Sequence, residues 1–272
     1  MDSALLVAFL VTLGAGLSTG VGSGLALFAK ATNDRFLAVA LGFSAGVMLY
    51  VSFVEILPKA MGFLGAGDTS VGMARGSIGF LAGLVLMALL YRFLPDLPMP
   101  RSEERRLPRG QLPLEEEESR SKLLRAGLLI ALAITIHNFP EGIATFFLTL
   151  DDPAVGFSVG TAIAIHNIPE GIAVAIPLFY ALHRRSWAFA LGVVSGLAEP
   201  LGAVIGYAIL QPYISDSLLG ILFAIVAGIM VYIAIDSLLP AAREFGSGQL
   251  AIYGVMAGMA VMAFSLVLFQ MG

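Results

Sequence analysis

Eight apolar stretches, each long enough to cross a lipid bilayer, decide what this chain can fold into. A transmembrane helix needs roughly 20 consecutive, mostly apolar residues. Because lipid cannot hydrogen-bond to the backbone, only helices and closed barrels are stable across a membrane. The pattern therefore predicts an all-α polytopic membrane protein with eight transmembrane helices. We expect these helices at residues 4–28, 36–57, 72–94, 123–148, 155–180, 187–211, 216–239 and 249–270.

The composition supports a membrane protein and excludes several kinds of chemistry. Charged residues make up 12% of the chain, whereas soluble domains carry about 25%. The sequence has no cysteine, so disulfides, thiolate metal sites and cysteine nucleophiles are excluded. No basic segment precedes the first apolar stretch. We therefore expect that stretch to be retained rather than cleaved as a signal peptide.

The lysine and arginine residues predict the orientation of the helices. All but two of the 15 lie in or beside the loops that follow the first, third, fifth and seventh apolar stretches, the exceptions being Lys59 and Arg75. Cytoplasmic loops of membrane proteins are enriched in these residues. The bias predicts that those four loops are cytoplasmic and that both termini lie outside.

The chain divides into four parts. Residues 1–94 contain transmembrane helices 1–3, and residues 123–180 contain helices 4 and 5, which carry the strongest motif described below. Helices 6–8 occupy residues 181–272. Between the first two parts, residues 95–122 form a cytoplasmic loop dense in both signs of charge, and we expect its acidic run at 115–118 to be solvated and disordered.

Two pairs of internal repeats are present. Residues 137–144 (HNFPEGIA) and 166–173 (HNIPEGIA) are identical at seven of eight positions, and residues 46–60 resemble residues 228–242 more weakly. Both pairs lie in helices that cross the membrane in opposite directions. Inverted repeats of this kind, here in a 3+2+3 arrangement, are typical of transporters that bind substrate near the midplane on interrupted helices.

The stronger repeat places polar side chains together in the middle of the membrane. Residues three and four positions apart share one face of a helix, and a rise of about 1.5 Å per residue puts both motifs in the middle third of the core. A further carboxylate, Glu199 in the sixth apolar stretch, lies at a similar depth. The residues that share these faces are His137, Asn138 and Glu141 in one motif and His166, Asn167 and Glu170 in the other.

Ionised groups at this depth need a partner, because each costs at least ~2.5 kcal/mol. Lysine and arginine are absent from the middle of these stretches, so no side-chain cation can balance the carboxylates. Imidazole nitrogens and carboxylate oxygens are good ligands for zinc and its first-row neighbours. Protons are the alternative, since carboxylates that face one another gain proton affinity.

These residues resemble a known family. The two HN-x-PEG helices, the glutamate of the sixth stretch, the eight helices and the long third loop are similar to the ZIP (Zrt/Irt-like) metal transporters over essentially the whole chain. The likeness is closest to their broad-range bacterial zinc-uptake branch. It implies zinc uptake into the cytoplasm across a bacterial cytoplasmic (inner) membrane, with iron, manganese, cobalt and cadmium as further substrates, by alternating access. Many relatives carry histidine clusters in the third loop, and this chain has none.

The resemblance also implies a two-metal site at the midplane. One position would use His137, Glu141, His166 and Glu170. The second would use Asn138, Asn167 and Glu199 together with both bridging glutamates. The family is further associated with an elevator-like movement of a transport bundle against a scaffold.

Three other residues are candidates for contact with the ion. Met48 matches a place where some relatives offer a thioether ligand. Glu55 and Asp236 lie near opposite ends of the second and seventh stretches. We interpret them as carboxylates that receive and release the ion, the alternative being solvated acids at the membrane interface.

Two other functions remain open at this point. An intramembrane metal-dependent hydrolase would need an open coordination position and a general base, but the His-Glu-x-x-His signature of such enzymes is missing. A purely structural metal site would not need inverted repeats. We expect no enzymatic activity, no catalytic residues and no cofactor apart from the transported ion. The expected partners are divalent metal ions and the lipid bilayer, without nucleic acid, and a homodimer is left open.

Overall fold

A computed structural model describes residues 3–28, 34–93 and 114–271 of the chain, which form helices and turns without any strand. The described residues contain eight helical segments long and apolar enough to cross a membrane, which confirms the predicted fold class. The helices are α1 (Ser3–Phe28), α2 (Asp34–Val51), α3 (Leu57–Gly65), α4 (Thr69–Phe93), α5 (Leu114–Asp151), α6 (Pro153–Leu182), α7 (Arg185–Gly196), α8 (Ala198–Leu210), α9 (Asp216–Ile233), α10 (Leu239–Phe245) and α11 (Gly248–Met271).

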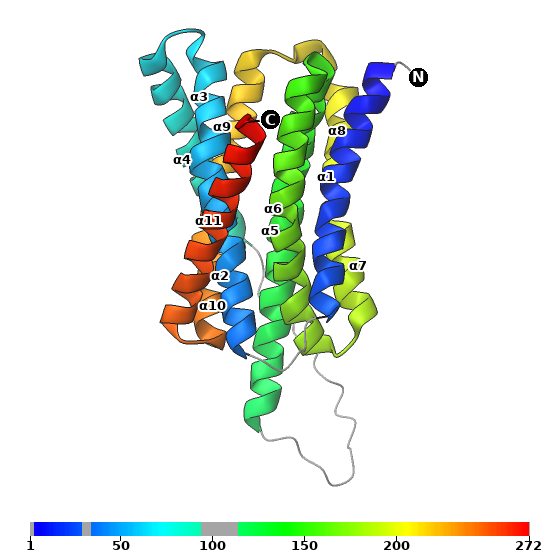
Figure 1. Cartoon of the computed structure of the whole chain (residues 1–272), viewed down its shortest axis with the longest axis vertical. Coiled ribbons are helices and arrows are strands. Elements are labelled where there is room, and N and C mark those ends of the chain that lie inside the picture. Colours follow the sequence, from blue (N-terminus) through cyan, green and yellow to red (C-terminus); the bar gives the residue numbers. More distant parts are fainter. Residues whose placement is uncertain (1–2, 29–33, 94–113, 272) are drawn as a thin grey trace.

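Successive spans run in opposite directions, and α1 begins at the same end of the bundle at which α11 ends (Figure 1). The connection between α5 and α6 lies at that end too. The second span is longer than predicted, because α2, a π-helical segment and α3 together form one span over Ala38–Gly65. The seventh span is extended in the same way, to Arg243.

The π-helical segments show that the weaker repeat is structural. A π-helix covers Ser52–Ile56 between α2 and α3, and another covers Ala234–Leu238 between α9 and α10. Each lies at the same place in its copy of the repeat and is followed two residues later by Pro58 or Pro240. A proline does not fit the ordinary helical register because it lacks an N–H and crowds the preceding turn. The wider turn relieves that conflict in both copies.

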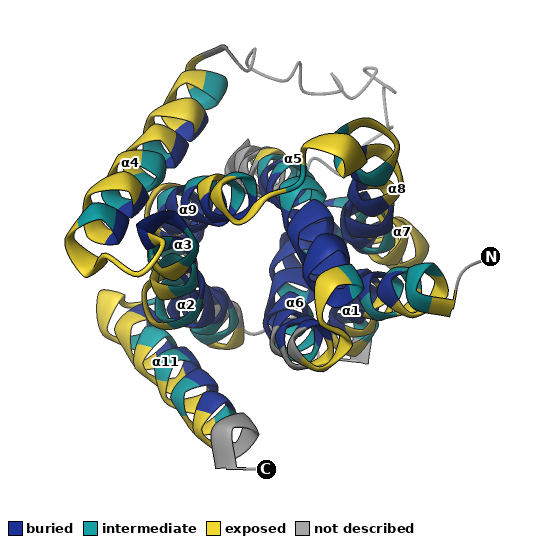
Figure 2. Cartoon of the chain, turned by 90° about the horizontal axis from the view of Figure 1, so that it is seen from above, coloured by how far each residue is buried: buried dark blue, intermediate teal, exposed yellow. Residues whose placement is uncertain are grey.

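Seen along the membrane normal, the helices form two groups (Figure 2). Helix α1 packs against α6 and α7, and α5 packs against α6 and α8. In the other group α2 packs against α11, while α4 packs against α3 and α9. The two groups meet where α2 lies against α6 and where α5 lies against α9. The predicted ligands on α5, α6 and α8 belong to the first group, and Met48 lies on α2 of the second group.

Two sequence-based expectations are wrong. The inverted repeats suggest interrupted helices at the binding site, but the fourth and fifth spans are continuous, because α5 runs through Pro140 and α6 runs through Pro169. The break in this group lies in the sixth span instead, at Leu197 between α7 and α8. Residues 114–122, expected to belong to a disordered loop, have a helical backbone as the start of α5. Residues 95–113 lie outside the described residues.

Candidate metal centre

The two strongest motifs form a buried layer of polar side chains between α5 and α6. The six motif side chains and Glu199 of α8 are all at most 1% exposed. Buried acids and imidazoles are rare in proteins unless they are paired or bind metal. The structure thus brings the seven ligands predicted from α5, α6 and α8 into one buried region, and their contacts define two halves of the site.

In the first half, each histidine faces the glutamate of the other helix. Nε2 of His137 lies 3.0 Å from Oε1 of Glu170, and Nε2 of His166 lies 3.1 Å from Oε1 of Glu141. The contacts are reciprocal because α5 and α6 carry the same motif and run in opposite directions. In a tetrahedral zinc site with bonds of about 2.0–2.1 Å, neighbouring ligand atoms are about 3.3 Å apart. The observed spacings are close to that value.

The hydrogen bond of Nδ1, the second ring nitrogen of His137, shows what Nε2 can bind. Nδ1 lies 3.2 Å from the carbonyl oxygen of Ala133, and since a carbonyl only accepts, Nδ1 donates. In the neutral ring Nε2 is then an acceptor, and it faces an oxygen of Glu170 that also accepts when ionised. A cation between these two atoms, either a proton or a metal ion, makes the contact favourable. Such an outer hydrogen bond is typical of metal-bound histidines.

The second half contains the two asparagines and Glu199. The amide Nδ2 of Asn138 donates to the carbonyl oxygen of Ser195 at 3.2 Å. That of Asn167 donates to the carbonyl oxygen of Ala15 at 2.9 Å and also to the carboxylate of Glu199. Because these carbonyls only accept, each amide presents its nitrogen to the backbone and leaves its oxygen for another partner.

Several of the buried oxygen atoms have no hydrogen-bond donor. They are Oδ1 of Asn138 and Asn167 and Oε2 of Glu141, Glu170 and Glu199. An unsatisfied buried acceptor costs about 1–3 kcal/mol, and a charged one costs more. All of these atoms would be satisfied by positive charge placed among them. The chemistry of the donor set, oxygen and imidazole nitrogen without sulfur, suits zinc and other first-row divalent ions.

The side chains do not form a finished coordination sphere. Among the described residues, no three histidine or acidic side chains converge closely enough to hold one ion as they stand. The observed arrangement is a set of pairs, and a shared ion would draw those pairs together. The assignment of two metal positions therefore stays a prediction.

Glycines beside the glutamates let the helix backbones touch at the site. A Cβ atom added to Gly142 would lie 2.1 Å from the carbonyl oxygen and 2.5 Å from the Cα of Glu199. A Cβ added to Gly171 would lie 1.9 Å from the carbonyl oxygen of Thr19 on α1. Small residues permit this close approach between membrane helices. The glycine after each glutamate thus brings α8 or α1 next to the metal helices.

The structure places the remaining candidates at different depths. Met48 is fully buried on α2, the helix that meets α6, and its role as a thioether ligand stays a prediction. Glu55 lies in the first π-helix and forms an ion pair with Lys59. Asp236 is exposed in the second π-helix, four residues after Tyr232, whose ring contacts Tyr91 of α4. The roles of Glu55 and Asp236 in receiving and releasing the ion stay predictions.

Sequence reasoning missed Ser195. Its carbonyl oxygen holds Asn138, and its hydroxyl donates to the carbonyl oxygens of Ala131 and Leu191. The residue also receives a hydrogen bond from Thr135. A serine two residues before the helix break and four before Glu199 is the one available signal. The role of its backbone carbonyl cannot be read from residue identity.

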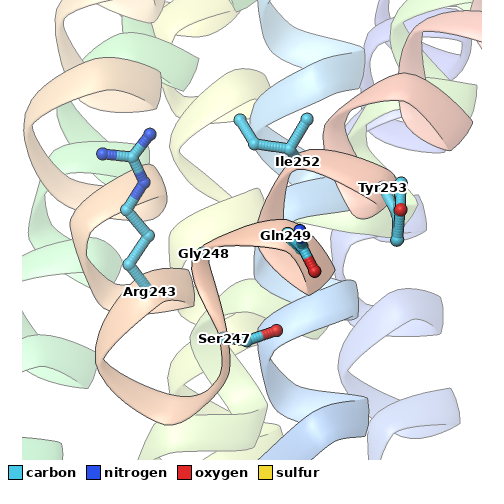
Figure 3. A pocket seen from close by; sticks show the side chains of 6 residues that line it. All are labelled: Arg243, Ser247, Gly248, Gln249, Ile252 and Tyr253. Carbon is cyan, nitrogen blue, oxygen red and sulfur yellow. The ribbon is translucent and has the colours of Figure 1, made fainter.

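Two cavities in the described part of the chain lie away from these ligands. One of about 490 Å³, at the turn between α10 and α11, is lined by Arg243, Ser247, Gly248, Gln249, Ile252 and Tyr253 (Figure 3). Another of about 420 Å³ lies between α1 and α6 and is mostly apolar. Neither is lined by a predicted metal ligand. The polar layer between α5 and α6 is therefore the candidate site on the strength of its chemistry.

Comparisons with known proteins point to the same chemistry. Residues 100–266 match the sequence profile of the family described as ZIP Zinc transporter. A protein named Zinc transporter ZupT from Nitratidesulfovibrio vulgaris is 51% identical over 98% of this chain and 99% of its own length. A protein of the same name from Chlorobium chlorochromatii is 52% identical over 99% of this chain and its own full length.

Proposed function

The chain belongs to the ZIP zinc transporter family, and from this premise we propose that it moves zinc into the cytoplasm through the polar layer between α5 and α6. Iron, manganese, cobalt and cadmium ions are further substrates in this proposal, because imidazole and carboxylate ligands accept all of them. The family indicates a transporter rather than an enzyme. No feature of the described residues favours a hydrolase.

The observation that carries the proposal is the set of buried oxygens without donors. Here the acceptors are paired only in part, and the described spans offer no lysine or arginine at this layer to compensate them. A divalent ion bound at this layer would compensate acceptors that are costly without one, and membership of the zinc transporter family favours an ion that is transported.

We assign two metal positions to this layer. His137, Glu141, His166 and Glu170 form the first, as their reciprocal contacts suggest. Asn138, Asn167 and Glu199 form the second, together with the second oxygens of Glu141 and Glu170. The glutamates then bridge the two ions.

The two groups of helices support alternating access by relative movement. Glycine contacts join helices within each group: Gly142 packs on α8, Gly171 on α1, and in the other group Gly46 packs on the backbone of α11 and Gly228 on that of α4. The contacts between the groups involve α2 with α6 and α5 with α9. We propose that the first group, which carries the ligands, moves as a unit against the second. The distribution of lysine and arginine favours external termini, in a bacterial cytoplasmic membrane.

Uptake of radiolabelled zinc into proteoliposomes tests the proposal. The double variant Glu141→Gln, Glu170→Gln keeps the shape of both side chains but removes two charges from the site. We expect it to lose zinc uptake, whereas Asp216→Asn, an exposed acid at the start of α9, should transport as the native chain does. Equal uptake by the native chain and the double variant would overturn the proposed function.

A further inference from the structure

The two copies of the strong repeat differ immediately after the segment that they share, residues 137–144 and 166–173. At the position four residues beyond each glutamate, α5 has Thr145 and α6 has Val174, and four residues further on α5 has Thr149 where α6 has Leu178. The chain thus extends the polar face of α5 by two turns but ends that of α6 in apolar residues. Along α5 this extension leads from Glu141 toward the end of the bundle that carries the α5–α6 connection (Figure 1).

Thr145 and Thr149 are both fully buried, and the hydroxyl of Thr145 is unusual. Threonine hydroxyls in helices commonly donate to the carbonyl four residues earlier, as those of Thr12, Thr135 and Thr149 do at 2.7–2.9 Å. Oγ1 of Thr145 makes no such bond and has no other hydrogen-bond partner, a property that it shares with Oγ1 of Thr19 on α1. An unsatisfied buried hydroxyl is unfavourable, and a valine, as in the other repeat, would fill the same space without that cost.

The residues of α6 opposite this stretch have no side chains. A Cβ atom added to Gly156 would lie 2.3 Å from Oγ1 of Thr149, and one added to Gly160 would lie 3.7 Å from Cγ2 of Thr145. Both threonines therefore lie in the contact between α5 and α6, the same contact that holds the metal ligands. They form the outer continuation of the polar layer, one and two turns beyond Glu141.

We propose that the hydroxyl oxygen of Thr145 contacts the divalent ion on its way between the outer end of the bundle and Glu141. The proposal rests on the transport function inferred above. A neutral oxygen ligand partly replaces water around the ion without holding it as tightly as a carboxylate does. Thr145 is then a transient ligand of the ion on the uptake path. The valine in the matching place on α6 indicates that the path on the other side of the site does not follow that face.

Two variants of Thr145 separate the hydroxyl from the shape of the side chain. Thr145→Val keeps the shape and removes the oxygen, whereas Thr145→Ser keeps the oxygen and removes a methyl group. In zinc uptake into proteoliposomes we expect Thr145→Val to lower kcat/KM about tenfold, the loss typical of a contact between a hydroxyl and a charged group. Thr145→Ser should recover most of the native rate. Val174→Thr, the reverse exchange at the matching position of the other repeat, should leave uptake unchanged.

Cysteine labelling gives a second readout that does not depend on these rates. The native chain has no cysteine, so Thr145→Cys introduces a single thiol. During transport a cationic methanethiosulfonate reagent added outside cells should modify it and block uptake, and zinc should slow the modification. For Val174→Cys, the rate of modification by the reagent should be the same with and without zinc.

The possible results separate a packing role from a contact with the ion. If Thr145→Val transports as the native chain does, or if Thr145→Ser is the more impaired of the two, Thr145 has only a packing role and the proposal is wrong. A thiol at position 145 that zinc does not protect contradicts it as well. Because Glu141→Gln, Glu170→Gln is measured in the same assay, failure of this inference is distinguished from failure of the transport function itself.

Discussion

Nε2 of His137 lies 3.0 Å from Oε1 of Glu170, although the two residues belong to different helices and are 33 positions apart. The contact between His166 and Glu141 repeats this relationship with the helices exchanged. If both members of a pair bind one ion, the loss of either side chain removes most of the binding free energy that the pair contributes together. Neighbouring residues that share a ligand are not additive in their effects.

A double-mutant cycle on this pair makes the first prediction. His137→Ala and Glu170→Ala should each raise the zinc dissociation constant at least about tenfold, as expected for charged contacts. In the double variant the zinc dissociation constant should rise by clearly less than the product of the two single-variant fold-changes. Calorimetric titration of the purified protein with zinc measures the dissociation constants of the two single variants, the double variant and the native chain. Full additivity would mean that the two side chains serve separate ions.

Met48 provides a prediction about metal preference. Met48→Leu conserves volume in a fully buried position and should cost less than about 1.5 kcal/mol in stability. If the thioether is a ligand, its loss should weaken cadmium binding more than manganese binding, because a soft sulfur prefers the softer ion. Met230→Leu, the same change at the matching position of the weaker repeat, serves as the control. An unchanged ratio of cadmium to manganese affinity would show that Met48 only fills space.

Much of the fold follows from the sequence because its strongest signals are local. The length of each apolar stretch decides whether it can cross a bilayer, and spacing along a helix decides which side chains share a face, as for His137 and Glu141. The burial of the motif residues can therefore be inferred from the amino-acid sequence alone. That residues of the two motifs share one site is implied by the family resemblance, which places His137, Glu141, His166 and Glu170 around one ion.

Other features depend on contacts that residue identity does not encode. The side chain of Asn167 donates to the backbone carbonyl of Ala15. Every residue on α1 has such a carbonyl, so the sequence does not show which one accepts this bond. Pro58 and Pro240 indicate a disturbance, but a π-helix, a kink and a break would each relieve a proline. Pro140 illustrates the converse, because the helix there remains continuous. A proline in an apolar stretch can therefore be accompanied by a π-helix or by a continuous α-helix, and tertiary packing decides which of the two forms.

Asp68, in the turn before α4, leads to a prediction about pH. Its carboxylate accepts hydrogen bonds from the hydroxyl of Ser70 and from the backbone N–H groups of Val71 and Ser70. These bonds, the first of them most strongly, hold the pKa of Asp68 below its ordinary value of 3.8. A lowered pKa in the folded state means that the stabilisation is present above the ordinary value and is lost as the pH falls through the folded one.

Hydrogen exchange at the amides of Ser70 and Val71 measures this contribution. At pH 7 both amides should exchange faster in Asp68→Ala than in the native chain, and the difference should shrink as the pH is lowered below the ordinary value of 3.8. Asp68→Asn keeps an acceptor oxygen and should retain part of the protection without the pH dependence. Equal exchange in the native chain and Asp68→Ala at pH 7 would show that Asp68 does not cap α4.

Gly142 tests whether the contact between α5 and α8 sets the geometry of the site. A methyl group at this position would lie within 2.6 Å of three backbone atoms of Glu199, and backbone cannot move aside as the end of a flexible side chain can. We expect Gly142→Ala to destabilise the protein by about 1–3 kcal/mol and to displace Glu199 from Asn167. Thermal unfolding and zinc titration of the purified protein should both show the change. Gly14→Ala on α1 is the matched control, because its added methyl group meets nothing within 4 Å. If Gly142→Ala unfolds at the native temperature and binds zinc with native affinity, α8 does not lie against α5 as the structure shows, and Glu199 cannot belong to the second metal position.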